Sequence, residues 1–316
     1  MASPWFSVPR MRKWVFAIAG VLSVAVVASY FLLPEPWSHA LTTLGRMQSG
    51  LERRSTAVDG REIVYLEGGS GPVIVMIHGF GANKDTWTRF AGALTPNYRV
   101  IAPDLPGFGE SRPRQGDRYD IESQTARSHE FVRALGLVRY HVIGSSMGGE
   151  IAGVLAHHWP AEVETLALVD ALGVPFVAPT AFTRAIQSGA NPFLVSNDQE
   201  FRNLLGLLFH TNPWVPYPIY IALRDDWIER RPQLESTFSD VRNTGEALLP
   251  LLPQIPARTL VLWGDNDQIL PVEGVHVFEQ KLPHAKVVVM KDCGHLPMME
   301  RPEEVALSYR GFLAAR

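Results

Sequence analysis

The stretch HVIGSSMGGE (141–150) places an apolar run directly before two serines and three glycines. Only one register fits the pattern G-x-S-x-G, and it puts Ser146 at the centre, between Gly144 and Gly148. In this pattern a strand turns sharply into a helix, so the central side chain is exposed at the tip of a strained turn. Ser145 lacks glycines at this spacing and is interpreted as a packing residue. The stretch predicts a serine nucleophile at the end of a strand.

A phosphate-binding turn is the competing interpretation of the same glycines. A P-loop requires G-x-x-x-x-G-K-[ST], and no lysine follows the glycines here. The nucleophile is therefore the preferred interpretation of Ser146.

Strands alternate with helical stretches on both sides of this turn. Helices are expected from Asp120, a suitable N-cap, to Gly136 and from Met147 to Trp159. Asp59-Gly60 predicts a tight hairpin between two further strands. Continuous apolar runs are typical of strands buried on both faces, so the alternation predicts a mostly parallel sheet with helices on both faces. The apolar runs are VIVMI (73–77), YRVIA (98–102), YHVIG (140–144), VETLALV (163–169), RTLVLW (258–263) and KVVVM (286–290).

Residues 172–255 interrupt this alternation with helix-like stretches and many prolines. An insertion at this point predicts a helical cap over the carboxyl ends of the strands, where open α/β sheets bind ligands. The core is then expected to comprise residues 51–171 and 256–316.

The most apolar part of the predicted cap is residues 204–223. One interpretation is ordinary packing against the main domain, and the other is an acyl-binding wall or a membrane-facing portal. On the second interpretation, the candidate substrate-binding residues are Leu208, Phe209, Trp214 and Tyr217.

A serine hydroxyl needs a base to take its proton and an acid to orient that base. His295 is the candidate base, because it lies in a short loop after the last predicted strand. Asp267 is the preferred acid, since it lies deeper in its loop than Asp265, which resembles a turn residue. Asp170, at the end of an earlier strand, is a third candidate for the acid or a simple strand-end turn residue.

The loop IHGFGANKDTW (77–87) is the candidate source of the oxyanion hole. Its Phe80 N–H, together with that of Met147, is expected to hold the oxyanion. His78 is expected to orient this loop rather than to act as a second base. Asp104 is interpreted as a strand-end turn residue and Cys293 as a small packed residue.

An uncharged run of 20 residues, 14–33, lies near the amino terminus. At about 1.5 Å per residue it spans roughly 30 Å, the thickness of the hydrocarbon core of a bilayer. Arg10, Arg12 and Lys13 precede it, so the positive-inside rule places residues 1–13 in the cytoplasm and everything after the span on the far side of the membrane.

Residues 34–50 are expected to form a linker, with a short helix along the membrane surface. The alternative to an anchor is a cleaved signal peptide, with Ser38-His39-Ala40 as the cleavage site and a secreted body. The apolar run is longer than the 7–15 residues or so of a usual signal h-region, which favours the anchor.

The composition indicates a globular protein and gives no sign of a nucleic-acid, metal or cofactor site. Apolar residues make up 46% of the 316 residues and charged residues 19%, which predicts a packed core. A net charge of −3 gives no electrostatic reason to expect a nucleic-acid partner. One cysteine allows no disulfide within the chain, and no metal-binding or dinucleotide-binding spacing occurs, so neither a metal nor a cofactor is expected.

These motifs together resemble the α/β-hydrolase superfamily in order and spacing. The run 78–94 and the anchor with its short linker are similar to membrane-associated lipases of the Moraxella and Psychrobacter type and to the mammalian membrane-anchored monoacylglycerol lipase. The resemblance implies an α/β-hydrolase fold, a triad of Ser146, Asp267 and His295, oxyanion donors at Phe80 and Met147, hydrolysis of lipid carboxylic esters, and no cofactor. The motifs are HGFG (78–81), PDLPGFGES (103–111), GSSMGG (144–149), WGDNDQILP (263–271) and GHLPMMERP (294–302).

We therefore expect a membrane-anchored serine hydrolase that cleaves carboxylic esters, with acylglycerols as the leading substrates. The alternatives are a carbon–carbon bond hydrolase, whose similar turn usually has Asn where Ser145 stands, an acyltransferase on the same triad, or a non-catalytic binding module. Epoxide hydrolases and haloalkane dehalogenases share the scaffold but use an aspartate nucleophile, so Ser146 argues against both.

Overall fold

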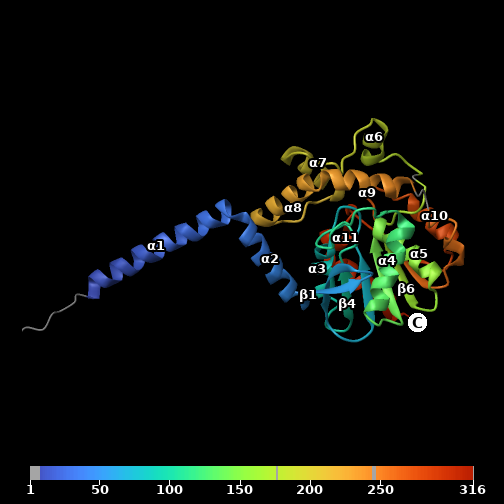
Figure 1. Ribbon diagram of the computed structural model, residues 1–316, viewed down its shortest axis with the longest axis horizontal. Helices are drawn as coiled ribbons and strands as arrows, with labels where there is room; N and C mark the ends of the chain where they lie inside the picture. Colours follow the sequence, from blue (N-terminus) through green and yellow to red (C-terminus); the bar gives the residue numbers. More distant parts are fainter. Residues whose placement is uncertain (1–7, 176, 244–246, 316) are drawn as a thin grey trace, which may run out of the picture.

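An eight-stranded sheet forms the centre of the computed structural model, which describes residues 8–175, 177–243 and 247–315 (Figure 1). The strand order is β1-β2-β4-β3-β5-β6-β7-β8. The pairs β1–β2 and β2–β4 are antiparallel and all other neighbours are parallel, which confirms the predicted sheet. The strands are β1 (Leu51–Val58), β2 (Arg61–Gly68), β3 (Val73–Ile77), β4 (Arg99–Pro103), β5 (Tyr140–Ser145), β6 (Val163–Val169), β7 (Arg258–Gly264) and β8 (Lys286–Met290).

The side chains of β3 alternate between two hydrophobic cores, one on each face of the sheet. Val75 and Ile77 belong to the first core, and Ile74 and Met76 belong to the second. This alternation explains why the strand is apolar at every position, because both of its faces are covered. The first core includes α4 (Ile121–Ala134), α5 (Met147–His158) and α10 (Gly274–Lys281), and the second includes α3 (Thr88–Gly92), α11 (Pro297–Glu300) and α12 (Pro302–Ala314).

Helices rather than strands fill the chain between β6 and β7 in the described residues. They lie together at one end of the sheet, at the top of Figure 1. Two of these helices, α6 (Ala181–Gln187) and α9 (Arg231–Asn243), line the same cavity as Ser146, which directly follows β5, so they cover the carboxyl ends of the parallel strands. The other two are α7 (Asp198–Leu208) and α8 (Tyr217–Glu229), and the short 3-10 turn η2 (Leu252–Gln254) comes just before β7.

A long helix, α1 (Val8–Leu32), projects away from this body (Figure 1). Its segment Trp14–Leu32 has a mean hydropathy of 2.4, and none of it is buried within the protein. The next helix, α2 (Pro34–Gln48), packs along α8 and β1. The expected short helix in the linker is therefore present, and it packs on the body. Residues 1–7 of the predicted tail lie outside the described residues.

A buried ion pair fastens the loops at the end of β3 and β4. Lys84, in the 3-10 turn η1 (Lys84–Trp87), places its Nζ 2.8 Å from Asp104 Oδ2 and 2.7 Å from Glu110 Oε1. Asp104 is fully buried and also accepts the N–H groups of Lys84 and Glu110 at 2.7 Å. Asp104 does directly follow β4, as expected of a strand-end residue, and its carboxylate in addition neutralises a buried ammonium.

Candidate functional site

The turn after β5 holds Ser146 in a strained backbone conformation. Its φ of 55° and ψ of −123° fall in a region that non-glycine residues rarely adopt. A Cβ on Gly144 would lie 2.0 Å from the carbonyl oxygen of Gly148, and one on Gly148 would lie 2.3 Å from that of Ile77. Both glycines are therefore required by close backbone approach, which is the physical reason for their spacing around the serine.

A buried histidine–aspartate pair lies at the same edge of the sheet, after β7 and β8. His295 Nδ1 lies 2.7 Å from Asp267 Oδ2, and both side chains are nearly inaccessible to solvent. The other oxygen, Asp267 Oδ1, accepts the N–H groups of Ile269 at 2.7 Å and Leu270 at 3.0 Å. Because these N–H groups fix the carboxylate, His295 Nδ1 carries the proton of this bond and Nε2 is left free to accept another.

The two competing acids have other partners. Asp265 Oδ1 accepts the amide of Asn266 at 2.7 Å and the N–H of Cys293 at 3.4 Å, so it shapes the turn. Asp170 is fully buried, and its Oδ1 accepts the N–H of Gly264 at 2.9 Å. Burial, followed by the nearby charge of Asp267, raises the pKa of Asp170 well above its usual range. The environment of Asp170 therefore favours its neutral form, whereas Asp267 is the acid that holds His295.

Asp170, Asp267 and His295 are also the kind of residues that bind metals, and their ligand atoms all lie within 4.8 Å of one another. Within this cluster Asp267 uses both oxygens, and His295 uses Nδ1, in hydrogen bonds to protein groups. These bonds orient His295.

The loop after β3 approaches Ser146 closely. A Cβ on Gly79 would lie 3.0 Å from the Cβ of Ser146. The buried imidazole of His78 accepts the N–H of Leu105 at Nε2, 3.0 Å away, so its Nδ1–H donates to the Gly79 carbonyl at 2.8 Å. Burial lowers the pKa of His78 to about 4, so it stays neutral. His78 thus orients the loop that carries Phe80, as expected from the sequence.

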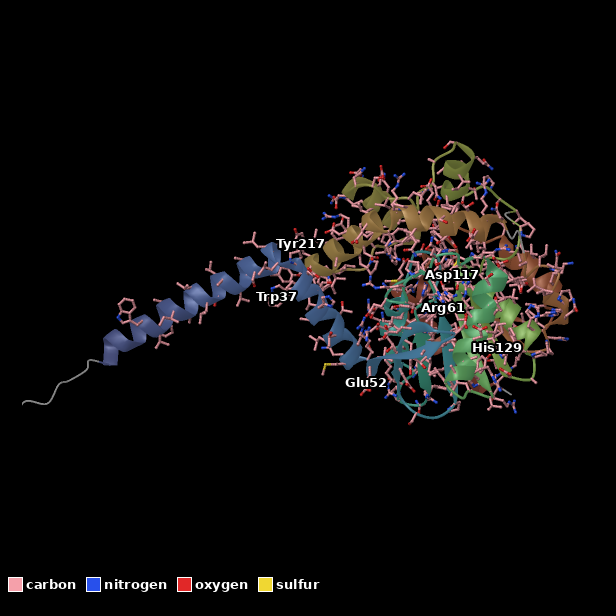
Figure 2. All side chains as sticks on the ribbon, in the orientation of Figure 1. Trp37, Glu52, Arg61, Asp117, His129 and Tyr217 are labelled. Carbon is pink, nitrogen blue, oxygen red and sulfur yellow. The ribbon has the colours of Figure 1, made fainter. Side chains whose placement is uncertain are left out.

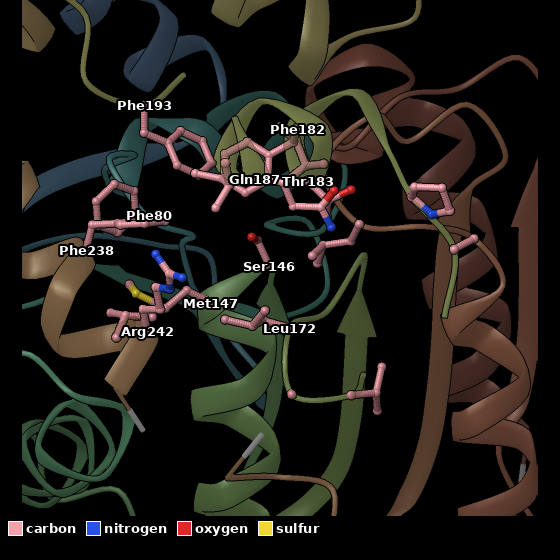
Figure 3. A pocket seen from close by; sticks show the side chains of 18 of the residues that line it. Phe80, Ser146, Met147, Leu172, Phe182, Thr183, Gln187, Phe193, Phe238 and Arg242 are labelled. Atoms are coloured by element: carbon pink, nitrogen blue, oxygen red, sulfur yellow. The ribbon is translucent and has the colours of Figure 1, made fainter. Parts of the chain in front are cut away.

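The Ser146 hydroxyl points into an apolar cavity of about 570 Å³ (Figure 3). Phe80 and Met147, the two expected oxyanion donors, line it beside the serine. The N–H of Met147, the first residue of α5, has no partner within that helix and points out of its amino end. The cap contributes most of the remaining apolar wall, through Phe182, Ile186, Phe193, Phe238 and Val241.

The four cap residues predicted to bind substrate lie elsewhere. Among the described residues, the lining of this cavity includes none of Leu208, Phe209, Trp214 and Tyr217. Leu208 and Phe209 instead support His295, because the Leu208 carbonyl accepts the His295 N–H at 2.9 Å and Phe209 is buried in the second core. Trp214 is 84% exposed. The pocket is built by α6 and α9 because these helices, rather than α7 and α8, pass over Ser146.

Glu300, a residue that positions the His295 loop, was not predicted from the sequence. Glu300 accepts the N–H of Gly294 at 3.0 Å, and it also accepts those of His210 at 3.1 Å and Thr211 at 2.9 Å. It therefore joins the His295 loop to the cap. Its place within the motif at 294–302 was the available signal, but nothing local marks the cap backbone as its partner.

A serine at a strand-to-helix turn, with a histidine–aspartate pair at the same edge of a mostly parallel sheet, defines the class of α/β enzymes that work by nucleophilic catalysis. The family model for the alpha/beta hydrolase fold matches residues 72–302. The chain belongs to this family.

Three similar proteins illustrate the relationship. Lipase 1 of Psychrobacter immobilis is 35% identical over 84% of this chain and 86% of its own length. Monoacylglycerol lipase ABHD6 of Mus musculus is 30% identical over 95% of both chains. A crystal structure described as a membrane phospholipase A and bacterial virulence factor superposes with a TM-score of 0.88, at 39% identity over 96% of this chain and 98% of that one.

Proposed function

We propose that this protein is a membrane-anchored serine hydrolase that cleaves carboxylic esters of lipids, acylglycerols first among them, through an acyl-enzyme. The observation that carries the proposal is the strained Ser146, whose hydroxyl points into an apolar cavity. The Asp267–His295 pair lies at the same edge of the sheet as this serine. An apolar cavity of this size suits an acyl chain beside the serine.

In the first half-reaction Ser146 Oγ attacks the ester carbonyl carbon while its proton passes to His295 Nε2. Asp267 stabilises the resulting imidazolium through the 2.7 Å bond to Nδ1. The N–H groups of Phe80 and Met147 hold the oxyanion. The bond to the leaving alcohol then breaks, and His295 returns the proton to that alcohol oxygen.

In the second half-reaction water replaces the alcohol. His295 Nε2 takes a proton from the water, whose oxygen attacks the acyl carbon, and the bond to Ser146 Oγ breaks. Ser146 regains its proton from His295, and a carboxylic acid leaves. Each residue therefore performs the same role twice, and the reaction needs no group beyond this chain and water.

The named relatives support lipid esters as the substrate class. Their names describe a lipase, a monoacylglycerol lipase and a membrane phospholipase A. The mostly apolar lining of the cavity, with aromatic rings from the cap, supports the same class.

We propose in addition that Trp14–Leu32 spans a membrane, with residues 1–13 in the cytoplasm and the body on the other side. The expected signal cleavage site at residues 38–40 falls inside α2, which packs on the body. This supports retention of the span, because a peptidase needs an extended substrate. Proteolysis of spheroplasts compared with inverted membrane vesicles tests the side on which the body lies.

The test of the activity uses the full chain in detergent micelles. Its substrates are p-nitrophenyl esters of increasing chain length, a monoacylglycerol, a triacylglycerol and a phosphatidylcholine. We expect turnover of medium or long acyl chains, and we expect Ser146→Ala to lower kcat by about 10⁴-fold or more. Ser145→Ala is the matched control, since Ser145 is buried in β5, outside the cavity.

Two results would contradict the proposal. Ester hydrolysis that survives in a folded Ser146→Ala protein would contradict the assignment of Ser146 as the nucleophile. If the wild-type protein turns over none of these esters, lipid esters are not its substrates, and carbon–carbon bond hydrolysis becomes the favoured activity.

A further inference from the structure

Aromatic side chains gather where α1 joins the body (Figure 2). The ring centroids of Phe31, in the last turn of α1, and Tyr217, the first residue of α8, are 5.3 Å apart. Tyr30 lies 5.7 Å from Trp37 of α2 and 6.5 Å from Tyr217. The carboxyl end of the apolar helix therefore contacts the cap directly.

The joint between α1 and α2 leaves little freedom. Only Leu33 separates the two helices, and its N–H donates to the Ser29 carbonyl at 2.9 Å. Trp37 Nε1 donates to Ser29 Oγ at 3.1 Å, across the joint. Arg46, near the other end of α2, binds both carboxylate oxygens of Asp85 at 2.7 Å. These contacts hold the amino end of α8 beside the last turn of α1.

The segment that precedes α8 and the first residue of α8 present exposed aromatic side chains at this place. Trp214 is 84% exposed, and Tyr217 is 42% exposed. Residues 210–216 (HTNPWVP) contain no Asp, Glu, Lys or Arg, and the Glu300 carboxylate that binds this segment contacts its first two residues, His210 and Thr211. The part of the segment around Trp214 therefore carries no full charge of its own into a less polar layer. Trp and Tyr are the residues enriched at bilayer interfaces, because their rings combine an apolar body with a polar atom.

We propose that residues 210–217 of the cap, with Trp214 at their tip, lie in the headgroup layer of the bilayer that α1 spans. The occupant of this surface is a lipid membrane, because the surface is continuous with the end of the membrane helix. The inference rests on the proposed anchor and adds a second contact with lipid.

This contact would adjoin the catalytic machinery. The first two residues of the segment, His210 and Thr211, donate their N–H groups to Glu300, and Leu208, two residues before the segment, accepts the His295 N–H. The bilayer surface would thus lie a few residues along the chain from the contacts that position the proposed base.

The test measures the depth of single nitroxide labels in phosphatidylcholine–phosphatidylglycerol vesicles that contain the full chain. Labels are attached in Trp214→Cys, in Val21→Cys within α1, and in Leu307→Cys, a position on α12 that is 66% exposed. The natural Cys293 is buried, so the wild-type protein serves as the unlabelled control. Collisions with oxygen report lipid, and collisions with a water-soluble nickel chelate report water.

We expect the label at 21 to be protected from nickel and the label at 307 to be open to it. The label at 214 should collide with nickel much less often than the label at 307 in the same vesicles. If position 214 is as open to nickel as position 307 while position 21 is in lipid, the cap contact is overturned and the anchor stands. If position 21 is also open to nickel, the anchor itself is overturned, and the cap contact with it. Neither outcome depends on the ester hydrolase activity.

Discussion

At residue scale, Asp170 and Asp267 have the same side chain but opposite roles, set by their neighbours. Asp267 receives two backbone N–H groups and the His295 imidazole, all of which favour a carboxylate. Asp170 receives one N–H and lies in a fully buried position beside that negative charge, which favours the neutral acid.

Exchange of each aspartate for asparagine separates these roles. Asp267→Asn should lower kcat by about 10⁴-fold, because an amide cannot stabilise the imidazolium and favours the wrong tautomer. Asp170→Asn should keep most of the activity, since asparagine matches a neutral acid in shape and can still accept the Gly264 N–H. Steady-state kinetics of both variants provides the measurement. An equal loss in both would contradict the assignment of Asp267 as the acid.

His78 should make the protein sensitive to acid. Its pKa of about 4 lies below the value of about 6.5 in an unfolded chain. Between these values the unfolded chain binds the proton and the folded protein does not, so the free energy of unfolding falls as the pH drops from about 6.5 to about 4, by up to about 3 kcal/mol. Urea unfolding followed by tryptophan fluorescence across this range, in wild type and His78→Asn, provides the test. Parallel curves for the two proteins would exclude His78 as the responsible group.

At the scale of elements, the loop between β8 and α11 depends on the cap for its position. A Cβ on Gly294 would lie 2.6 Å from the His210 nitrogen and 2.8 Å from the Leu208 carbonyl oxygen, so the loop backbone lies directly against the end of α7. Glu300 joins the same two segments with three hydrogen bonds. The cap therefore holds the loop of the proposed base in position, and it also lines the cavity.

Glu300→Ala tests this support. Removal of the carboxylate leaves the N–H groups of Gly294, His210 and Thr211 without their acceptor, so His295 should lose its fixed position. A small misplacement of a catalytic group can cost about 10²-fold in rate, and we expect kcat to fall by roughly 10- to 100-fold with little change in KM. Glu303→Ala, at an exposed position in the first turn of α12, is the matched control. Equal kinetics in the two variants would contradict the role of Glu300.

At the scale of the whole molecule, the apolar helix α1 is connected to the body by folded structure. Helix α2 packs along α8 and carries Arg46, whose guanidinium pairs with Asp85 and lies 3.8 Å from Glu110. Glu110 in turn pairs with Lys84 and Arg53; although burial opposes ionisation, these partners lower the pKa of Glu110 to about 2. One chain of charges therefore runs from α2 to the buried Asp104, next to the loop that carries Phe80.

Arg46→Met should loosen this connection. Methionine keeps an apolar stem of similar length but loses the bidentate bond to Asp85, so the α2 backbone should open more often. Hydrogen exchange measured by mass spectrometry should show faster exchange in residues 34–48 and little change in β5. Arg54→Met is the control, because Arg54 is half exposed and pairs with Glu52 of β1 and Glu67 of β2 rather than with Asp85 or Glu110. Unchanged exchange in α2 would show that helix packing alone holds it.

The sequence by itself determined the features that depend on local sterics and periodicity. The G-x-S-x-G spacing reports a turn whose glycines touch neighbouring backbone, so Ser146 could be identified without a structure. Continuous apolar runs report strands covered on both faces, and an uncharged run near the amino terminus reports a helix long enough to cross a bilayer. Each of these signals is contained in a short stretch of chain.

Only the tertiary structure decided which distant groups meet. Three aspartates were candidates for the acid of the triad. The hydrogen bond to His295 selects Asp267, because its loop turns toward β8 while Asp170 faces Gly264. The cavity wall came from α6 and α9 instead of the more apolar segment around α8, since the path of a cap over the sheet is set by packing between elements. Glu300 binds His210, 90 residues away, and Asp104 binds Lys84, 20 residues away. Such separations leave no local pattern in the sequence.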